Sequence, residues 1–361
     1  MPAEIVTVAE VLKKAGYATG CFGMWNLGRG KNSPVTPTGQ GFDLFLRPQD
    51  LGYEKHRYLK EDGSYLTDDF TDEALEFIDQ AGGRPFFVYL PYHAIHAPFE
   101  PPADLLAKYQ RKLQALDDSK TDPEYLASVE ALDRNVGRIM ADLEKRGIAK
   151  NTTVLFTSDN GGIPSRISPL KGSKGSLYEG GLKVPAAVWG YGVKASGQVC
   201  EEVVLGMDFY PTLVELAGLS NDPSHRPDGM SLVPLFRGEK SLERESLFWH
   251  FPCYIGKGSP SSVIRKGNLK LIHFFEDKRS ELYDLLRDPN ETNDLSESKV
   301  REKELLEKEL FAWWKETGAA LPSGSNPSFD PTAVSKRKGG TDGKNKGSKK
   351  DQSKDKKRNK N

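Results

Sequence analysis

The stretch TTVLFTSDNGG, residues 152–162, joins an apolar run to two polar residues and a pair of glycines. Its first half has the β-branched and aromatic composition of a buried strand, which would deliver SDNGG to its carboxyl end. Two further runs have the same form: YATGCFG (17–23) leads into MWNLG, and PFFVYLPY (85–92) leads into HAIHAP. The sequence therefore predicts three strands, each followed by a loop of candidate functional residues.

Helical patterns lie between these strands. Thr7 and Glu10 have capping-box spacing, which predicts a helix over residues 8–15. Apolar residues on one face predict a helix over 68–80, and Asp122-Pro123 is a favourable start for a long one. Helices that alternate with apolar strands indicate an α/β fold with a mostly parallel central sheet flanked by helices. Ligands bind such sheets at the carboxyl ends of the strands.

The pattern changes after about residue 240. Short alternating runs such as LKLIHFF and ELYDL, joined by a turn at 276–279, predict an antiparallel sheet. An amphipathic helix over 301–316 follows. We therefore predict an incomplete α/β domain (1–239), a small antiparallel α+β subdomain with a C-terminal helix (240–320) and a disordered Lys-rich tail (321–361).

Composition narrows the functional classes. The chain has 361 residues, 37% of them hydrophobic, which is enough for a sizeable core. Its formal net charge is zero, but Lys336–Asn361 holds twelve Lys or Arg against three Asp, so residues 336–361 carry +9 and residues 1–335 carry −9. The tail could attract nucleic acid electrostatically. It lacks interleaved aromatic residues, so we do not expect nucleic acid as a partner.

Three cysteines, Cys21, Cys200 and Cys253, are widely spaced and odd in number. This spacing suggests neither a disulfide framework nor a zinc site. No apolar run has the length of a membrane span, and the first residues lack the features of a signal peptide. The compartment is therefore not indicated, and neither is the oligomeric state.

Asp159 and Asn160 offer a carboxylate and an amide oxygen, both suited to calcium or magnesium. Two adjacent residues reach one metal only if the backbone turns sharply, which Gly161-Gly162 would permit. The alternative is an ordinary Asx turn that closes the strand, and the stretch taken alone favours it.

Two further loops carry candidate residues. His93 and His96 lie three apart in PYHAIHAP, where a histidine could protonate a leaving group or hold an oxyanion. Taken alone, such histidines are more often packing or surface residues. Lys171 and Lys174 in a glycine-rich loop suit a sulfate or phosphate, but their spacing does not match a P-loop, and a solvated basic loop is the alternative.

Taken together and in this order, FGMWNLG, PYHAIHAP, TSDNGG and KGSLYEGGLKVPA resemble the successive motifs of the sulfatases of the arylsulfatase type. The resemblance covers about residues 5–300. It implies an alkaline-phosphatase-like α/β fold with a small C-terminal antiparallel subdomain. It also implies hydrolysis of sulfate esters with calcium and a formylglycine made from an active-site Cys or Ser.

Carried over residue by residue, the resemblance implies that Asp159 and Asn160 are two of the calcium ligands. Lys174 would contact the substrate sulfate, and His96 would contact the sulfate and assist departure of the leaving group. These roles suit sulfuryl transfer, which places negative charge on oxygens that a metal, a lysine and a histidine stabilise. A sulfated small molecule or glycan is the implied partner, and members are often periplasmic or secreted.

The match departs from the family pattern in the loop after the first predicted strand. That loop normally reads Gly-Lys-Trp-His-Leu-Gly, where the lysine holds the formylglycine and sulfate and the histidine handles the formylglycine hydroxyl. Here Met24 and Asn26 occupy those positions. A thioether carries no positive charge and an amide is no general base near neutral pH. We therefore expect a loop that keeps its shape without its chemistry.

The family's pair of metal-binding aspartates and its nucleophile motif, Cys/Ser-x-Pro/Ala-x-Arg, find no match in the sequence. The expectation is an N-terminally truncated domain with an incomplete calcium site, without turnover as a sulfuric ester hydrolase. One alternative is a non-catalytic pseudoenzyme that binds sulfated glycans or another oxyanion. Another, less favoured, is a phosphoester or phosphonate hydrolase of the same superfold.

Overall fold

The computed structural model describes residues 2–28, 33–163, 166–220, 227–254, 258–324 and 326–329, so most of the predicted tail, including Lys336–Asn361, lies outside the described residues. The chain divides into two compact units. The first comprises Met1–Asp159 and Pro185–Glu243, and the second comprises Asn160–Val184 and Arg244–Asn361. The sequence predicts a single boundary near residue 240, whereas these units also separate the segment 160–184 from its neighbours along the chain.

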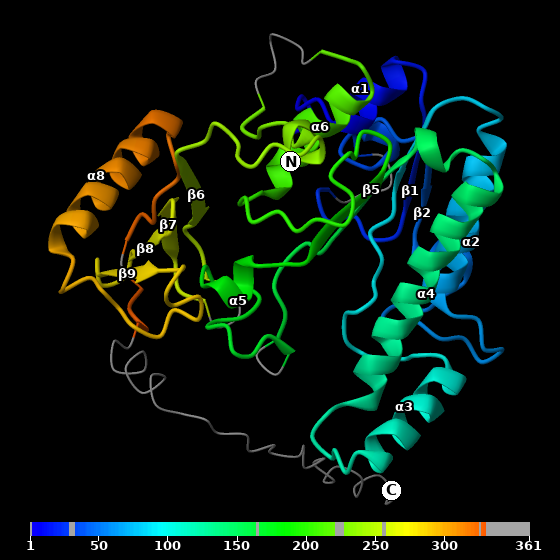
Figure 1. The fold of residues 1–361 in the computed structure, drawn as a ribbon, viewed down its shortest axis with the longest axis horizontal. Coiled ribbons are helices and arrows are strands. Elements are labelled where there is room, and N and C mark those ends of the chain that lie inside the picture. The colour runs from blue at the N-terminus through cyan, green and yellow to red at the C-terminus, as the bar shows by residue number, and fades with distance from the viewer. Residues whose placement is uncertain are drawn as a thin grey trace, which may run out of the picture. The chain divides into compact units, whose positions relative to one another are not determined.

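A parallel sheet forms the first unit's centre (Figure 1). Its strand order is β2-β1-β3, with bounds β1 (Ala18–Phe22), β2 (Leu44–Leu46) and β3 (Phe86–Tyr89). Gly20 of β1 pairs with Leu44 on one side and Val88 on the other, both in parallel. All five residues of β1 are buried, as the middle strand of a covered sheet requires. The predicted parallel α/β arrangement is confirmed.

The first unit's helices are α1 (Val8–Lys14), α2 (Leu66–Gln80), α3 (Ala103–Ala115), α4 (Pro123–Lys145), α6 (Phe209–Leu216) and α7 (Val233–Phe236). Helices α1 and α4 begin where the sequence predicts and α2 begins two residues earlier, whereas α3, α6 and α7 were not predicted. Short 3-10 turns span Thr38–Gln40, Pro48–Leu51, Ala149–Asn151 and Gly206–Asp208. The capping box of Thr7 and Glu10 is present, and the Asp122 side chain caps α4. Phe70 and Phe77 of α2 pack with Phe22 of β1 in the main core of this unit.

The strand that contains TTVLFT differs from the prediction. It is β4 (Thr153–Thr157), and it pairs antiparallel with β5 (Ala186–Gly190) in a two-stranded sheet. Its side chains are half-buried or exposed, with Phe156 36% exposed, so the prediction of a buried strand was wrong. An apolar run indicates a strand but not the direction or number of its neighbours, and here the pairing partner decides its burial.

The second unit contains the predicted antiparallel sheet. Its strand order is β6-β7-β8-β9, with bounds β6 (Ser246–Phe251), β7 (Ser261–Lys266), β8 (Leu269–Phe274) and β9 (Ser280–Asp284). The predicted turn lies between β8 and β9, and the predicted C-terminal helix is α8 (Val300–Thr317). A four-residue helix, α5 (Glu179–Leu182), completes the unit.

Each face of this second sheet has its own cover. Ile264, Leu271 and Leu282 pack with Leu306 and Leu310 of α8. On the other face, Val263, Ile272, Phe274 and Tyr283 form a cluster on which Leu177 and Tyr178 pack. The segment before α5 therefore covers the face of the sheet that α8 does not cover.

Candidate functional site

The loop after β1 keeps a defined shape through packing. Gly23 has a φ of 132°, and a Cβ there would lie 2.2 Å from the Pro91 carbonyl oxygen. Met24 N donates a hydrogen bond to the same oxygen at 3.0 Å. The Trp25 indole donates to the Val35 carbonyl at 3.0 Å and packs edge-on against Phe42. Trp25 is thus a packing residue of this loop.

The two substituted positions in this loop contact each other. Asn26 Nδ2 donates to Met24 Sδ at 3.1 Å, and the Asn26 side chain is exposed. A thioether and an amide together supply neither a fixed positive charge nor a proton acceptor of useful basicity. This local chemistry agrees with the expectation drawn from the sequence.

The loop after β3, residues 91–98 and here called the histidine loop, carries His93 and His96. The His93 ring stacks on Phe70 with a centroid distance of 6.2 Å and lies 5.7 Å from the Tyr58 ring. Its Nδ1 is buried without a hydrogen-bond partner among the described residues. Burial lowers the pKa of His93 to about 4, with smaller contributions from the nearby His96 and His56. His93 is therefore a neutral packing residue near pH 7.

His96 has a different environment in the same loop. Its side chain is exposed, and its Nδ1 lies 2.6 Å from the Ala97 carbonyl oxygen. Because a carbonyl only accepts, Nδ1 carries the proton of this hydrogen bond. The other ring nitrogen, Nε2, then remains for a ligand. Of the two predicted histidines, His96 is the exposed one and His93 is the packing one.

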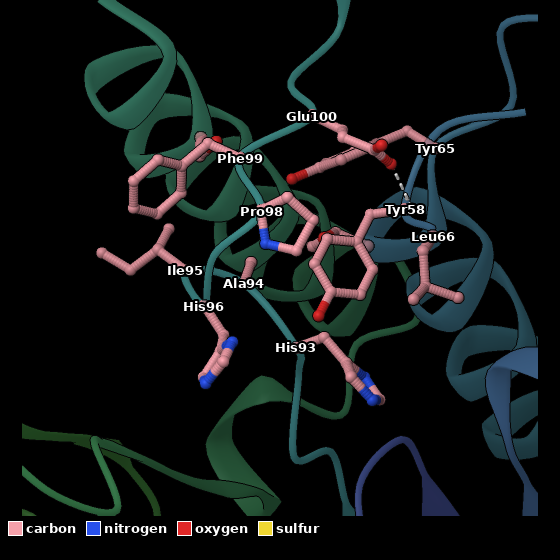
Figure 2. A pocket seen from close by; sticks show the side chains of 12 residues that line it. Tyr58, Tyr65, Leu66, His93, Ala94, Ile95, His96, Pro98, Phe99 and Glu100 are labelled. Atoms are coloured by element: carbon pink, nitrogen blue, oxygen red, sulfur yellow. Dashed lines mark hydrogen bonds between the residues drawn. The ribbon is translucent and has the colours of Figure 1, made fainter. Parts of the chain in front are cut away.

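The histidine loop borders a small hollow within the first unit (Figure 2). The space free of atoms is about 250 Å³, open solvent included. Figure 2 shows the His93 and His96 rings pointing toward the same end, away from Glu100. Glu100 accepts hydrogen bonds from Tyr58 N at 2.7 Å and Leu59 N at 3.3 Å, so its carboxylate is committed to the backbone. The lining residues are Tyr58, Tyr65, Leu66, Thr67, His93, Ala94, Ile95, His96, Pro98, Phe99, Glu100 and Ser128.

Asp159 follows β4 and is exposed. Its charge adds to the effect of burial and of Cys21 in raising the pKa of Tyr89, which places the carboxylate near the end of β3. The described residues contain no group of three or more His, Cys, Asp or Glu side chains that could hold a metal ion. Calcium takes six to eight oxygen ligands, and the Asp159 carboxylate and the Asn160 amide oxygen have the chemistry that such a ligand requires.

The glycines after Asn160 make a close backbone contact. Neither Gly161 nor Gly162 has a positive φ. Gly161 N donates to Gly181 O at 3.0 Å, and a Cβ on Gly161 would lie 2.0 Å from Gly180 O. Glycine is needed here because two backbones touch. The contact joins SDNGG to LYEGG within the second unit.

Residues 171–181, here called the lysine loop, contain both candidate lysines and place them in different environments. The Lys171 ammonium donates to Tyr283 Oη at 2.8 Å, lies 3.5 Å from Glu281 Oε2 and sits over the Tyr178 ring at 4.2 Å. Lys174 is exposed, and no described residue pairs with its ammonium group. The structure therefore leaves Lys174, and not Lys171, available to an anion.

Sequence reasoning did not find the partners of Lys171. Glu281 and Tyr283 lie about a hundred residues further along, on β9, and no short motif connects them with the lysine loop. The one available signal was the unusual density of polar groups in ELYDL, which the alternating strand pattern explained equally well.

Comparison with known proteins decides the family. A sulfatase family model matches residues 2–219, and a model of the C-terminal part of N-sulphoglucosamine sulphohydrolase matches residues 173–314. The chain belongs to the sulfatase family. This sulfatase is 39% identical over 254 residues to a sulfatase of Formosa agariphila, a match that covers 64% of this chain and 46% of the relative. It is 30% identical over 325 residues to human arylsulfatase A, covering 76% of this chain and 59% of the relative.

A solved structure extends the likeness to the fold of the sulfatase. Ps i-CgsB in complex with k-i-k-neocarrahexaose has a TM-score of 0.74 and 26% identity, covering 93% of this chain and 79% of that one. The fold is thus that of the alkaline-phosphatase-like sulfatases. The chain spans about half the length of the curated relatives it matches. None of the described helices has both the length and the apolar character that crossing a membrane requires.

Proposed function

We propose that this sulfatase-family chain recognises the sulfate group of a sulfated carbohydrate through Lys174 and His96. The observation that carries the proposal is the contrast within the lysine loop. Lys171 is committed to Tyr283 and Glu281, whereas the Lys174 ammonium is exposed without a partner among the described residues. An uncompensated ammonium in a fixed loop suits an oxyanion. The resemblance of the motifs assigns a sulfate contact to each of these two side chains.

His96 contributes the second part of the proposal. The hydrogen bond to the Ala97 carbonyl fixes the ring and assigns a proton to Nδ1, which leaves Nε2 to meet the ester. When the imidazole is protonated, Nε2 donates to the ester oxygen on which negative charge develops. When it is neutral, Nε2 accepts from a hydroxyl group of the ligand. Sulfatases generally use calcium and a formylglycine, and we propose Asp159 and Asn160 as two calcium ligands without deriving a step through the metal.

A neighbour of the same fold supports the proposed substrate class. Ps i-CgsB is bound to k-i-k-neocarrahexaose, an oligosaccharide. We therefore propose a sulfated glycan as the ligand of this chain. A sulfate ester of a sugar presents one localised anion on a neutral ring, which one lysine and one histidine can recognise.

Hydrolysis is the weaker part of the assignment. The loop after β1 presents Met24 and Asn26 where the family pattern has lysine and histidine, and the two side chains contact each other. We propose that this chain binds sulfate esters and turns them over poorly. A pseudoenzyme that only binds them is the second candidate function. The same contact between Met24 and Asn26 favours that candidate.

Titration with inorganic sulfate and 4-nitrophenyl sulfate tests the proposal. Lys174→Ala should weaken binding by about tenfold to hundredfold, because it removes a charge-assisted contact. Lys183→Ala is the matched control, since Lys183 is exposed in the same segment and its loss changes the net charge equally. Equal affinities of the two variants would remove Lys174 from the site. If the chain releases 4-nitrophenol in the presence of Ca²⁺ and Lys174→Ala abolishes that release, the chain is an active hydrolase and not only a binding protein.

A further inference from the structure

The lysine loop is fastened to the C-terminal sheet at one end by a buried ion cluster. Lys270 of β8 has a side chain that is 1% exposed, and its ammonium lies 2.8 Å from Glu179 Oε1 and 2.9 Å from Glu291 Oε1. The Glu291 side chain is completely buried, and its Oε2 accepts a hydrogen bond from Glu179 N at 2.7 Å. Buried charges persist when they are paired, so this cluster joins the end of the loop to β8 and to the turn after β9.

A second cluster fastens the rest of the loop to β9. The Tyr178 and Tyr283 hydroxyls both donate to Glu281 Oε2 at 2.6 Å, and Lys171 donates to the Tyr283 hydroxyl. Arg279 pairs with the other oxygen of Glu281. Burial alone would raise the pKa of Glu281, but the two tyrosines and the charges of Lys171 and Arg279 outweigh it and lower that pKa. The carboxylate therefore stays charged and keeps all four groups in place.

Lys174 lies between these two fastened positions. Gly180 N donates to Lys171 O at 2.8 Å, which closes the loop, and Lys174 N donates to Gly162 O at 2.9 Å. A Cβ on Gly180 would lie 2.6 Å from Lys171 O, so the closure leaves no spare room. The backbone of Lys174 is fixed on both sides, while its side chain is exposed.

We infer that Lys270, Glu281 and Glu291 are positioning residues that hold Lys174 for an oxyanion. None of them contacts the anion; each acts through the loop. The inference rests on the proposed role of Lys174 and goes beyond it, because it makes the C-terminal sheet part of the recognition machinery. A fixed backbone lowers the entropy that binding must spend on ordering a lysine side chain and its loop.

A double-mutant cycle separates positioning from general stability. The probe is inorganic sulfate, titrated against the full chain and four variants: Lys270→Met, Lys174→Ala, the double variant and Lys266→Met. Lys266 is the matched control, because it pairs with Glu309 and Glu245 at the end of β7 and does not touch the lysine loop. Lys270→Met should weaken sulfate binding by about tenfold, as removal of outer support for a ligand-contacting group typically does. It should cause no further loss in the Lys174→Ala background, since its effect passes through Lys174.

Hydrogen exchange gives the second readout. Lys270→Met should raise exchange over residues 171–181 relative to β7, and Lys266→Met should not. If Lys270→Met fails to fold, Glu281→Gln replaces it, because the amide keeps an acceptor for the tyrosines while the ion pairs with Lys171 and Arg279 are lost.

The outcomes distinguish the two claims. Equal loss of affinity from Lys270→Met in both backgrounds, or sulfate binding by Lys270→Met and Glu281→Gln that matches Lys266→Met, would overturn the positioning role alone. Unchanged sulfate binding by Lys174→Ala would overturn the proposed function, and the positioning role with it. Loss confined to the background that contains Lys174 supports both.

Discussion

The histidine loop and the lysine loop carry the two proposed sulfate contacts, and the fold holds them by opposite means. The histidine loop packs by aromatic burial, with His93 between Phe70 and Tyr58 and its Nδ1 unpaired within the described part of the chain. The lysine loop is held by charges that are buried in pairs, around Lys270 and Glu281. Burial lowers the pKa of the unpaired His93 and so favours its neutral form, whereas the partners of Glu281 outweigh burial and keep that carboxylate charged. The first loop should therefore respond to pH and the second to loss of a charged neighbour.

The largest effect we expect is on stability, from Lys270→Met. Removing this ammonium leaves Glu179 and Glu291 buried without their counter-charge, which should lower the free energy of unfolding by about 3–5 kcal/mol. Lys266→Met removes more exposed ion pairs and should change the free energy of unfolding far less than Lys270→Met does. Urea unfolding followed by circular dichroism measures both. Losses of equal size would show that the cluster around Lys270 is no different from a surface ion pair.

A smaller effect should follow from Gly161→Ala, which tests the backbone contact behind the lysine loop. The new Cβ would lie 2.0 Å from Gly180 O, so the two segments must move apart, at a cost of about 1–3 kcal/mol. Gly137→Ala is the control, because Gly137 lies inside α4 with no atom within 4 Å of the new Cβ. That change should stabilise the helix by about 0.5–1 kcal/mol. Thermal unfolding should show a lower melting temperature for Gly161→Ala and a higher one for Gly137→Ala. Shifts of the same sign in both variants would contradict the proposed backbone contact.

Local patterns predicted the elements of this fold well. The capping box at Thr7, the start of α4 after Asp122 and the β8–β9 hairpin follow from residues that are neighbours in the sequence. The antiparallel pairing of β4 could not be predicted, because its apolar run is compatible with either direction and any neighbour. Pairing is decided by segments far along the chain.

The same limit applies to the candidate site. The alternating pattern of LKLIHFF did not indicate that Lys270 is buried. In the structure Lys270 lies on the same side of β8 as Ile272 and Phe274, whose cluster is covered by Leu177 and Tyr178, and it is buried. The motif resemblance selected Lys174 and His96 as candidates, but the residues alone did not show why Lys174 and not Lys171 would stay available. That distinction depends on Tyr283 and Glu281, which lie over a hundred residues away.

The smallest effect concerns His93 and tests the aromatic side of the comparison. The pKa of His93 is about 4 in the folded chain against an ordinary value of 6.5. Between pH 4 and pH 6.5, His93 is therefore protonated in the unfolded state and neutral in the folded state. Stability should therefore be full above pH 6.5, fall as the pH drops through this window, and stop falling from this cause below pH 4. Because the ring is only partly buried, we expect a contribution of about 1 kcal/mol.

His93→Phe isolates this contribution. Phenylalanine keeps the stacking on Phe70 and cannot titrate, while every carboxylate of the chain remains in both proteins. Urea unfolding at pH 7.5 and pH 4.5 should give a smaller loss of stability for the variant than for the unchanged chain. Identical losses would mean that the folded state accepts the proton on His93 after all, through a partner reached by local opening of the histidine loop. The two loops would then be alike in keeping their charges, and the contrast between apolar and paired burial would not hold.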